Sequence, residues 1–257
     1  MRALHWLDPH LPGQPFPPVD EALDEPNGLL AIGGDLSEPR LLRAYQAGIF
    51  PWYEPGQPIL WWAPDPRAVL RPSHVRIRRS LRKALRNRPY TITLDSAFRA
   101  VVDGCGAGNP DRRETWITGE MAAAYARLYD HGHAHSVEVW DREGTLVGGL
   151  YGVALGRIFY GESMFSTQRD ASKIALVYLA RQLQAWGYPL IDCQLPSEHL
   201  MSLGAELIPR RWFTPLLDRW TRVAGRPAPW RLDPELDVLA WQPEDAEPHT
   251  PQWGPVP

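Results

Sequence analysis

The sequence predicts an α+β protein built around a mixed, largely antiparallel sheet. Three strand-like runs, 136–140, 146–154 and 157–160, follow one another across two short turns, which is typical of an antiparallel meander. Helical periodicity precedes this meander, after Thr118, and follows it over about 171–186. A proline-rich stretch comes before all of these elements and favours a separate small unit.

The composition restricts the class of protein. At 257 residues the chain can form one large domain, or a main domain with a smaller companion. Cys105 and Cys193 form neither a metal motif nor a disulfide framework, which fits a reducing cytoplasm. The sequence has no signal-like N-terminus and no run of about eighteen apolar residues, so we expect a cytoplasmic protein without a membrane span. Because the net charge is only −3, nucleic-acid binding would have to come from local clusters of charge.

The first unit, from Met1 to about Asp65, is expected to be small and irregular. Five prolines between residues 9 and 18 exclude a long helix there. A helix is expected between Ser37 and Gly48. The aromatic residues of 50–62 are expected to pack the two units together, although a tryptophan on a loop can also stack on a nucleobase.

The next segment is strongly basic. Residues 67–88 contain eight Arg and one Lys, with no Asp or Glu. Within this segment 78–86 fits a helix whose leucines form an apolar edge and whose Arg79, Lys83 and Arg86 share one face. Since charges of one sign repel each other, we interpret this face as a contact for nucleic-acid phosphates rather than as a plain solvated surface.

Two weaker patterns follow the basic segment. We expect a short helix over 96–103 and a flexible, glycine-rich surface loop over 103–110. His131, His133 and His135 alternate, as the ligands of some zinc sites do. The segment that holds them spans a helix end and a glycine, so no metal site is predicted.

The most informative polar residues follow the meander. Residues 161–165 are expected to leave its third strand, and they do not match a G-x-S-x-G nucleophile elbow, so no serine nucleophile is expected. The next helix is followed by a short apolar strand, 190–195. Strand alternation places Asp192 and Gln194 on one face of this strand. Such a pair is either a structural hydrogen-bonding pair or the polar face of a cleft, because buried polar groups need partners.

The chain ends in an acidic, proline-rich tail. Residues 232–257 hold six acids, six prolines and no Lys or Arg, which is typical of a poorly ordered or loosely docked segment. Such a tail could shield the basic helix electrostatically. The sequence therefore divides into a small N-terminal domain over 1–65, a main domain over 66–231 and the tail.

Eight blocks of sequence, in order, carry a resemblance to a known family. They are Glu25–Asp35, Ala47–Trp52, Trp61–Arg67, Thr115–Thr118, Gly132–Glu138, Gly161–Ser166, Ile191–Gln194, and Ser202–Ala205 with Ile208–Arg211. Together they resemble the bacterial leucyl/phenylalanyl-tRNA–protein transferases over about residues 1–222. The resemblance implies a small N-terminal domain followed by a GNAT-like acyltransferase domain.

The resemblance also implies an activity, which is aminoacyl transfer. An enzyme of this family takes Leu or Phe from the 3′ end of a charged tRNA and joins it to the α-amino group of a protein that begins with Arg or Lys. The product carries a degradation signal of the N-end rule pathway. The implied partners are aminoacyl-tRNA and these acceptor proteins, with no membrane, no metal and no small cofactor, and we expect a monomer.

The resemblance assigns roles to individual residues. It implies that Asp192 handles the proton of the attacking amine and that Gln194 orients or polarises the reacting carbonyl. The implied apolar pocket for the Leu or Phe side chain consists of Leu150, Phe159, Met164, Leu176, Leu179 and Leu183, bordered by Glu162 as a ligand for the amino group of the donor or the acceptor. The terminal adenosine is expected to stack near Tyr45, Trp52, Trp116 and Tyr125. Arg79, Lys83 and Arg86 are expected to contact tRNA phosphates.

Two other interpretations remain at this point. A GNAT-type acetyltransferase would use acetyl-CoA, but that class cradles pyrophosphate on a glycine-bearing loop, and the corresponding loop 164–172 contains no glycine. A non-catalytic RNA-binding protein would explain the basic helix. It would leave Asp192, Gln194 and the apolar pocket without a purpose.

Overall fold

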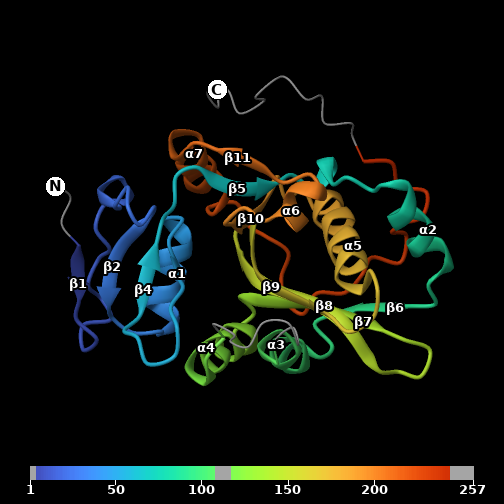
Figure 1. Ribbon diagram of the computed structural model, residues 1–257, viewed down its shortest axis with the longest axis horizontal. Helices are drawn as coiled ribbons and strands as arrows, with labels where there is room; N and C mark the ends of the chain where they lie inside the picture. Colours follow the sequence, from blue (N-terminus) through green and yellow to red (C-terminus); the bar gives the residue numbers. More distant parts are fainter. Residues whose placement is uncertain (1–3, 108–116, 244–257) are drawn as a thin grey trace.

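The computed structural model describes residues 4–107 and 117–243, which form two sheets with helices around them (Figure 1). The smaller sheet has the order β1-β2-β4-β3. Its strands are β1 (His5–Leu7), β2 (Leu29–Gly33), β3 (Phe50–Pro51) and β4 (Leu60–Trp62), and helix α1 (Glu38–Gln46) lies beside it. The expectation of an irregular first unit is therefore wrong. These strands are too short, at two to five residues, to produce a pattern of alternation.

The larger sheet has seven strands in the order β11-β5-β10-β9-β8-β7-β6. β9 and β10 are parallel, and every other neighbouring pair is antiparallel, so the prediction of a mixed, largely antiparallel sheet is confirmed. The strands are β5 (Arg67–Leu70), β6 (Thr91–Leu94), β7 (Ala134–Trp140), β8 (Leu146–Leu155), β9 (Ile158–Ser166), β10 (Leu190–Gln194) and β11 (Glu206–Ile208).

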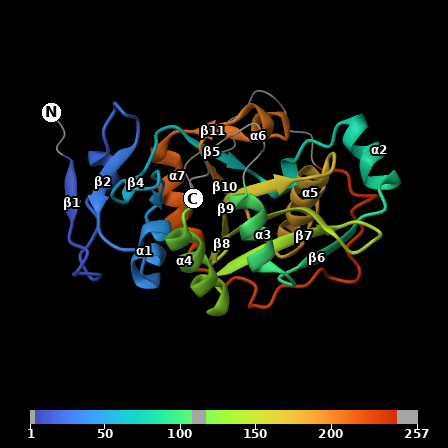
Figure 2. The same cartoon turned by 60° about the horizontal axis from the view of Figure 1, so that its bottom comes forward.

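Helices cover both faces of the larger sheet (Figures 1 and 2). Helices α3 (Phe98–Gly106) and α4 (Gly119–Asp130) lie on one face, and α5 (Ala171–Ala185) lies on the other. The Thr118 hydroxyl accepts a hydrogen bond from the Met121 N–H and so caps α4, as the sequence predicts. Helix α5 is the crossover that makes β9 and β10 parallel.

Three further helices lie at the edges of the molecule. They are α2 (Arg79–Asn87), α6 (Glu198–Ser202) and α7 (Arg210–Trp220). The α2 helix lies at the opposite end of the molecule from the small sheet (Figure 1). No helix within residues 4–107 and 117–243 has the length and hydropathy that a membrane span requires.

Two local predictions differ from the structure. Residues 103–106 form the last turn of α3 rather than part of a glycine-rich loop, because Val101, Val102 and Cys105 pack into the core. Residues 161–165 do not leave the third strand of the meander, since β9 continues to Ser166. The first difference shows that buried side chains can hold a helix together despite its glycines.

The beginning of the C-terminal tail is docked, and the expectation of a loosely attached segment is wrong for its described part. Val238 and Trp241 are buried, and Asp233 Oδ2 accepts hydrogen bonds from Gln182 Nε2 at 2.7 Å and Trp186 Nε1 at 2.8 Å. Just before this segment, Trp230 is 1% exposed. The tail therefore contributes apolar residues to the core on the α5 side of the sheet.

Candidate active site

The candidate site lies where β9 and β10 separate. Their pairing ends at Tyr160 and Asp192, although β9 continues for six more residues to Ser166. Each strand also has a bulge on its other side. Glu162 has no partner in β8, and Cys193 has none in β5. Because bulges re-aim side chains near their position, Glu162 and Gln194 approach each other across the gap.

A cavity of about 290 Å³ occupies this gap. Its apolar wall contains Leu150, Phe159, Met164, Leu176, Leu179, Ile191 and Leu200, and its polar wall contains Tyr151, Glu162, Ser163, Gln194, Ser197 and His199. Most residues of the expected pocket line this cavity. Leu183 does not; it is buried elsewhere in the core that α5 covers.

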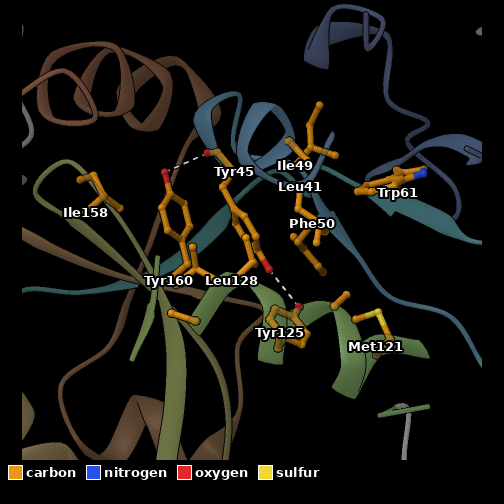
Figure 3. Close-up of a cluster of buried hydrophobic side chains, with 14 of the residues drawn as sticks. Leu41, Tyr45, Ile49, Phe50, Trp61, Met121, Tyr125, Leu128, Ile158 and Tyr160 are labelled. Atoms are coloured by element: carbon orange, nitrogen blue, oxygen red, sulfur yellow. Dashed lines mark hydrogen bonds between the residues drawn. The ribbon is translucent and has the colours of Figure 1, made fainter. Parts of the chain in front are cut away.

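Glu162 is the centre of a hydrogen-bond network at the polar end of the cavity. Its Oε1 accepts from the Tyr45 hydroxyl at 2.8 Å and from Gln194 Nε2 at 2.9 Å, and its Oε2 accepts from the Tyr125 hydroxyl at 2.6 Å. The two hydroxyls also contact each other at 2.9 Å (Figure 3). Burial, with the nearby Asp192 charge, raises the pKa of Glu162 to about 7 despite these three donors. The carboxyl group can therefore change its charge near neutral pH.

The four aromatic residues expected around an adenosine do not form one stacking site. Tyr45 and Tyr125 are both 0% exposed, and their hydroxyls donate hydrogen bonds to Glu162. Because neither ring has a face open to a nucleobase, the expectation is wrong for both. Trp52 is 42% exposed and packs edge-on against Trp62. Trp116 lies outside the described residues.

Asp192 is buried and does not belong to the lining of the cavity. It is 0% exposed and forms two hydrogen bonds with Arg67, from Nε to Oδ1 at 2.8 Å and from Nη2 to Oδ2 at 2.7 Å. The Arg67 guanidinium also lies over the rings of Phe50, at 4.8 Å, and Phe213, at 5.0 Å. This arrangement leaves no face of the Asp192 carboxylate open to an incoming amine.

Asp192 and Gln194 do not present their side chains on one face, so that expectation is wrong. Gln194 has a positive φ of 63° and lies beyond the bulge at Cys193, which turns its side chain toward Glu162. Asp192 reaches Gln194 through the backbone, since its Oδ1 accepts from the Gln194 N–H at 2.9 Å. Asp192 can thus fix the unusual backbone conformation of Gln194, while Gln194 itself lines the cavity.

The basic helix presents its charges to solvent. Leu81, Ala84 and Leu85 of α2 are buried, whereas Arg79, Lys83 and Arg86 are exposed. Arg76, Arg78 and Arg88 are exposed beside them. None of these six cations has an ion pair with an acid in the described part of the chain. Arg82 points instead to the C-terminal segment, where Nη1 donates to the Trp241 carbonyl and Nη2 to Gln242 Oε1.

The three alternating histidines do not converge. His131 and His133 both pair with Glu38, whereas His135 Nδ1 lies 2.8 Å from Asp95 Oδ2, and the His135 ring stacks on Trp230. Within residues 4–107 and 117–243, no group of three His, Cys, Asp or Glu side chains is placed to hold a metal ion.

Sequence reasoning missed Arg67 and several residues of the cavity lining, which are Tyr151, Ser163, Ile191, Ser197, His199 and Leu200. Arg67 lies 125 positions from Asp192 in the chain, so only the fold brings them together. Tyr151 lines the cavity, but its place in an apolar strand is the pattern of an ordinary core residue. The charge of Arg67 beside the apolar run of β5 is the only signal in the sequence that could have pointed to a buried ion pair.

Comparisons with known proteins agree with the resemblance seen in the sequence. A family model described as "Leucyl/phenylalanyl-tRNA protein transferase" matches residues 69–218, and a model of the N-terminal domain of the same family matches 34–65. A leucyl/phenylalanyl-tRNA–protein transferase from Alkalilimnicola ehrlichii is 52% identical over 240 residues, which are 93% of each chain. The relatives of the same name from Thiobacillus denitrificans and Nitrosomonas europaea are each 58% identical, over 85% of this chain and 95% and 92% of theirs.

Proposed function

This chain belongs to the leucyl/phenylalanyl-tRNA–protein transferase family, and we propose that it transfers Leu or Phe from aminoacyl-tRNA to the α-amino group of proteins that begin with Arg or Lys. The enzyme acts as a cytoplasmic monomer, and its product carries an N-end rule degradation signal. The observation that carries the proposal is the cavity between β9 and β10, which combines an apolar wall with a titratable carboxyl group. Such a cavity suits an amino acid, which has an apolar side chain next to an amino group.

The apolar wall is the binding site for the donor side chain. A volume of about 290 Å³ is near the lower end of the roughly 300–1,000 Å³ typical of small-molecule sites, so it suits one Leu or Phe residue rather than a larger group. Burial of such a side chain contributes about 1.5–3 kcal/mol. Polar side chains would leave water behind and find no hydrogen-bond partner on this wall.

The reaction needs a positioned amine more than it needs a nucleophilic side chain. The aminoacyl ester is already activated, and direct attack by the acceptor amine requires no covalent enzyme intermediate. Gln194 Nε2 donates to Glu162, which leaves Gln194 Oε1 free to accept an N–H of the incoming amine. Glu162, whose pKa of about 7 is close to that of an α-amino group, takes up the amine proton.

The role of Asp192 changes in this mechanism. Its carboxylate is fully buried and occupied by Arg67, so we assign it a positioning role in place of direct proton transfer. It holds the Gln194 N–H and thereby sets the direction of the Gln194 side chain. The expected catalytic pair therefore becomes Gln194 and Glu162, supported by Asp192.

The tRNA is held mainly through its backbone. The exposed cations of α2, including Arg79, Lys83 and Arg86, offer a contact for phosphates that does not depend on base sequence. Trp52, the exposed member of the aromatic residues considered above, is the candidate for stacking on the terminal adenosine, and Trp116 keeps that assignment from the family resemblance.

We also propose the domain division and the GNAT-like architecture. The small sheet lies within residues 5–62 and the large sheet begins at Arg67, which is compatible with a boundary near residue 65. A parallel strand pair that is joined by α5 and then separates around a cavity is compatible with a GNAT-like acyltransferase.

The proposed function is tested by transfer of labelled Leu from charged tRNA to a peptide that begins with Arg. We expect transfer to this peptide and none to the same peptide with an acetylated N-terminus. Gln194→Ala should slow single-turnover transfer at least 10-fold with tRNA binding intact. Absence of transfer by the wild-type chain, with binding of acetyl-CoA, would favour acetyl transfer instead.

A further inference from the structure

Tyr151 carries a hydroxyl group that the fold buries without a partner. Its side chain is 0% exposed, and its hydroxyl accepts or donates no hydrogen bond in the part of the chain that the structure describes. Leaving such a group unpaired costs about 1–3 kcal/mol, and phenylalanine at this position would avoid that cost. An unsatisfied buried polar group calls for an explanation, and a bound ligand that pairs with the hydroxyl would supply one.

The surroundings of Tyr151 place it at the reaction site. The residue lines the cavity, and in the sheet it lies opposite Ser163, next to the bulge that carries Glu162. Its ring packs edge-on against Phe98 and Tyr125, with centroids 5.8 and 5.3 Å away, so its orientation is fixed by neighbours. Burial, together with the charge of Glu162, raises the pKa of Tyr151 well above its usual range. The phenol therefore stays protonated and remains a hydrogen-bond donor at neutral pH.

Other donors at this end of the cavity are already used. The hydroxyls of Tyr45 and Tyr125 and one N–H of the Gln194 amide donate to Glu162. Attack on an ester turns its carbonyl oxygen into an oxyanion, which needs a donor that is in place before the reaction. Two groups of the cavity wall, the Tyr151 hydroxyl and His199 Nε2, are buried without a hydrogen-bond partner in the described part of the chain. Tyr151 is the one that lies in β8 beside the Glu162 bulge, whereas His199 lies on α6.

We propose that the Tyr151 hydroxyl donates a hydrogen bond to the carbonyl oxygen of the aminoacyl ester, and so acts as a catalytic residue for the transfer. This inference rests on the proposed function. The amine nitrogen forms a bond to the carbonyl carbon, and the carbonyl π electrons move to the oxygen that Tyr151 stabilises. When the carbonyl re-forms, the bond to the ribose oxygen breaks. The proton that Glu162 takes from the amine then passes to that oxygen, which gives an amide and a free tRNA hydroxyl.

The test is Tyr151→Phe, which removes only the hydroxyl. We expect kcat to fall by about 10²–10³-fold, the usual effect of losing one oxyanion donor, with KM for charged tRNA and for the peptide within 3-fold. The midpoint of urea unfolding should stay the same or rise, because the unpaired group is gone. A purely structural hydroxyl predicts the same stability result with unchanged kcat, so kcat separates the two.

Tyr129→Phe is the matched control. The Tyr129 ring stacks on Phe98 in the same aromatic cluster, but its hydroxyl donates to the Asp95 carbonyl, and the residue does not line the cavity. This variant should lose some stability and keep its kcat. An unchanged kcat in Tyr151→Phe, or a raised KM for tRNA with normal kcat, overturns the inference while the proposed function stands. A wild-type chain that transfers no Leu would refute the proposed function itself.

Discussion

At the scale of single residues, the buried pair of Arg67 and Asp192 determines how the cavity is supported. Both side chains are at most 1% exposed, and each satisfies the charge of the other. Phe50 of the small sheet and Phe213 of α7 both pack against the guanidinium. Asp192 Oδ1 also accepts a hydrogen bond from the Gln194 N–H. The pair therefore links the small sheet and α7 to the backbone of Gln194.

Removing one member of this pair should destabilise the fold more than removing both. Arg67→Met leaves a buried carboxylate unpaired, and we expect urea unfolding to show a loss of about 3–5 kcal/mol. Adding Asp192→Leu should recover most of this stability. Single-turnover transfer should stay at least 10-fold slow in the double variant, because the Gln194 N–H has lost its acceptor. Wild-type transfer by the stable double variant would contradict the positioning role of Asp192.

Glu162 should make stability depend on pH. Its pKa is raised from 4.5 to about 7, so between these values the folded chain binds a proton that the unfolded chain has released. The free energy of unfolding should therefore fall by up to about 3 kcal/mol as pH rises through this window. Glu162→Gln cannot ionise and should lack this loss. Urea unfolding of both proteins at pH 5 and pH 8 measures the difference, and parallel pH profiles would argue against a raised pKa.

The same group should shape the pH profile of transfer. Because the ionised carboxylate takes up the amine proton, the single-turnover rate should rise through an inflexion near pH 7. In Glu162→Gln this inflexion should disappear, and the one that remains should belong to the acceptor amine, at about 7.7–8.0. An inflexion near 7 that persists in the variant would assign it to another group.

At the scale of elements, α2 should act as an electrostatic contact. Changing Arg79, Lys83 and Arg86 to Gln should weaken tRNA binding and reduce the slope of log affinity against log salt by up to about 3. Fluorescence anisotropy at several salt concentrations measures both effects. The same change at Arg99 and Arg219, which lie on other helices, is the control. A slope that stays constant in the α2 variant would contradict the phosphate contacts.

Long periodic elements were predictable from the sequence, whereas single-residue irregularities were not. The α4 and α5 helices and the β7–β9 meander occur where hydrophobic periodicity places them. The bulges at Glu162 and Cys193 were not predictable, because one extra residue reverses the alternation without leaving a signal. These two bulges decide which polar side chains reach the cavity. Strand alternation placed Asp192 and Gln194 on one face and left open whether they form a hydrogen-bonding pair or line a cleft, whereas in the structure Gln194 lines the cavity and Asp192 does not.

At the scale of the whole molecule, the C-terminal segment packs against a residue of the apolar wall of the cavity. Trp230 is stacked on His135 at 3.6 Å, donates its backbone N–H to Asp95 Oδ2 at 2.6 Å and packs against Phe159. Phe159 forms part of the apolar wall. Residues beyond the matched family model, which ends at 218, thus contribute to the shape of the site.

Two changes in this segment should differ in their effect on stability. Trp230→Ala removes a fully buried ring, and we expect it to lower the free energy of unfolding by about 3–5 kcal/mol and to weaken the selection of Leu over smaller amino acids. Ending the chain after Pro243 keeps every buried residue of the described part of the segment and should leave the thermal midpoint unchanged. Thermal unfolding and competition between charged tRNAs measure these effects. A Trp230→Ala protein with normal stability would contradict the docking described here.

The position of Trp230 also has a consequence for biosynthesis. Translation proceeds from the N-terminus, so β7, β8 and β9 are synthesised before residues 226–241. The hydrophobic surface around His135 and Phe159 stays uncovered during that interval. Completion of the donor site therefore waits for the synthesis of residues 226–241, and a chain that stops before them would leave this apolar surface exposed to solvent.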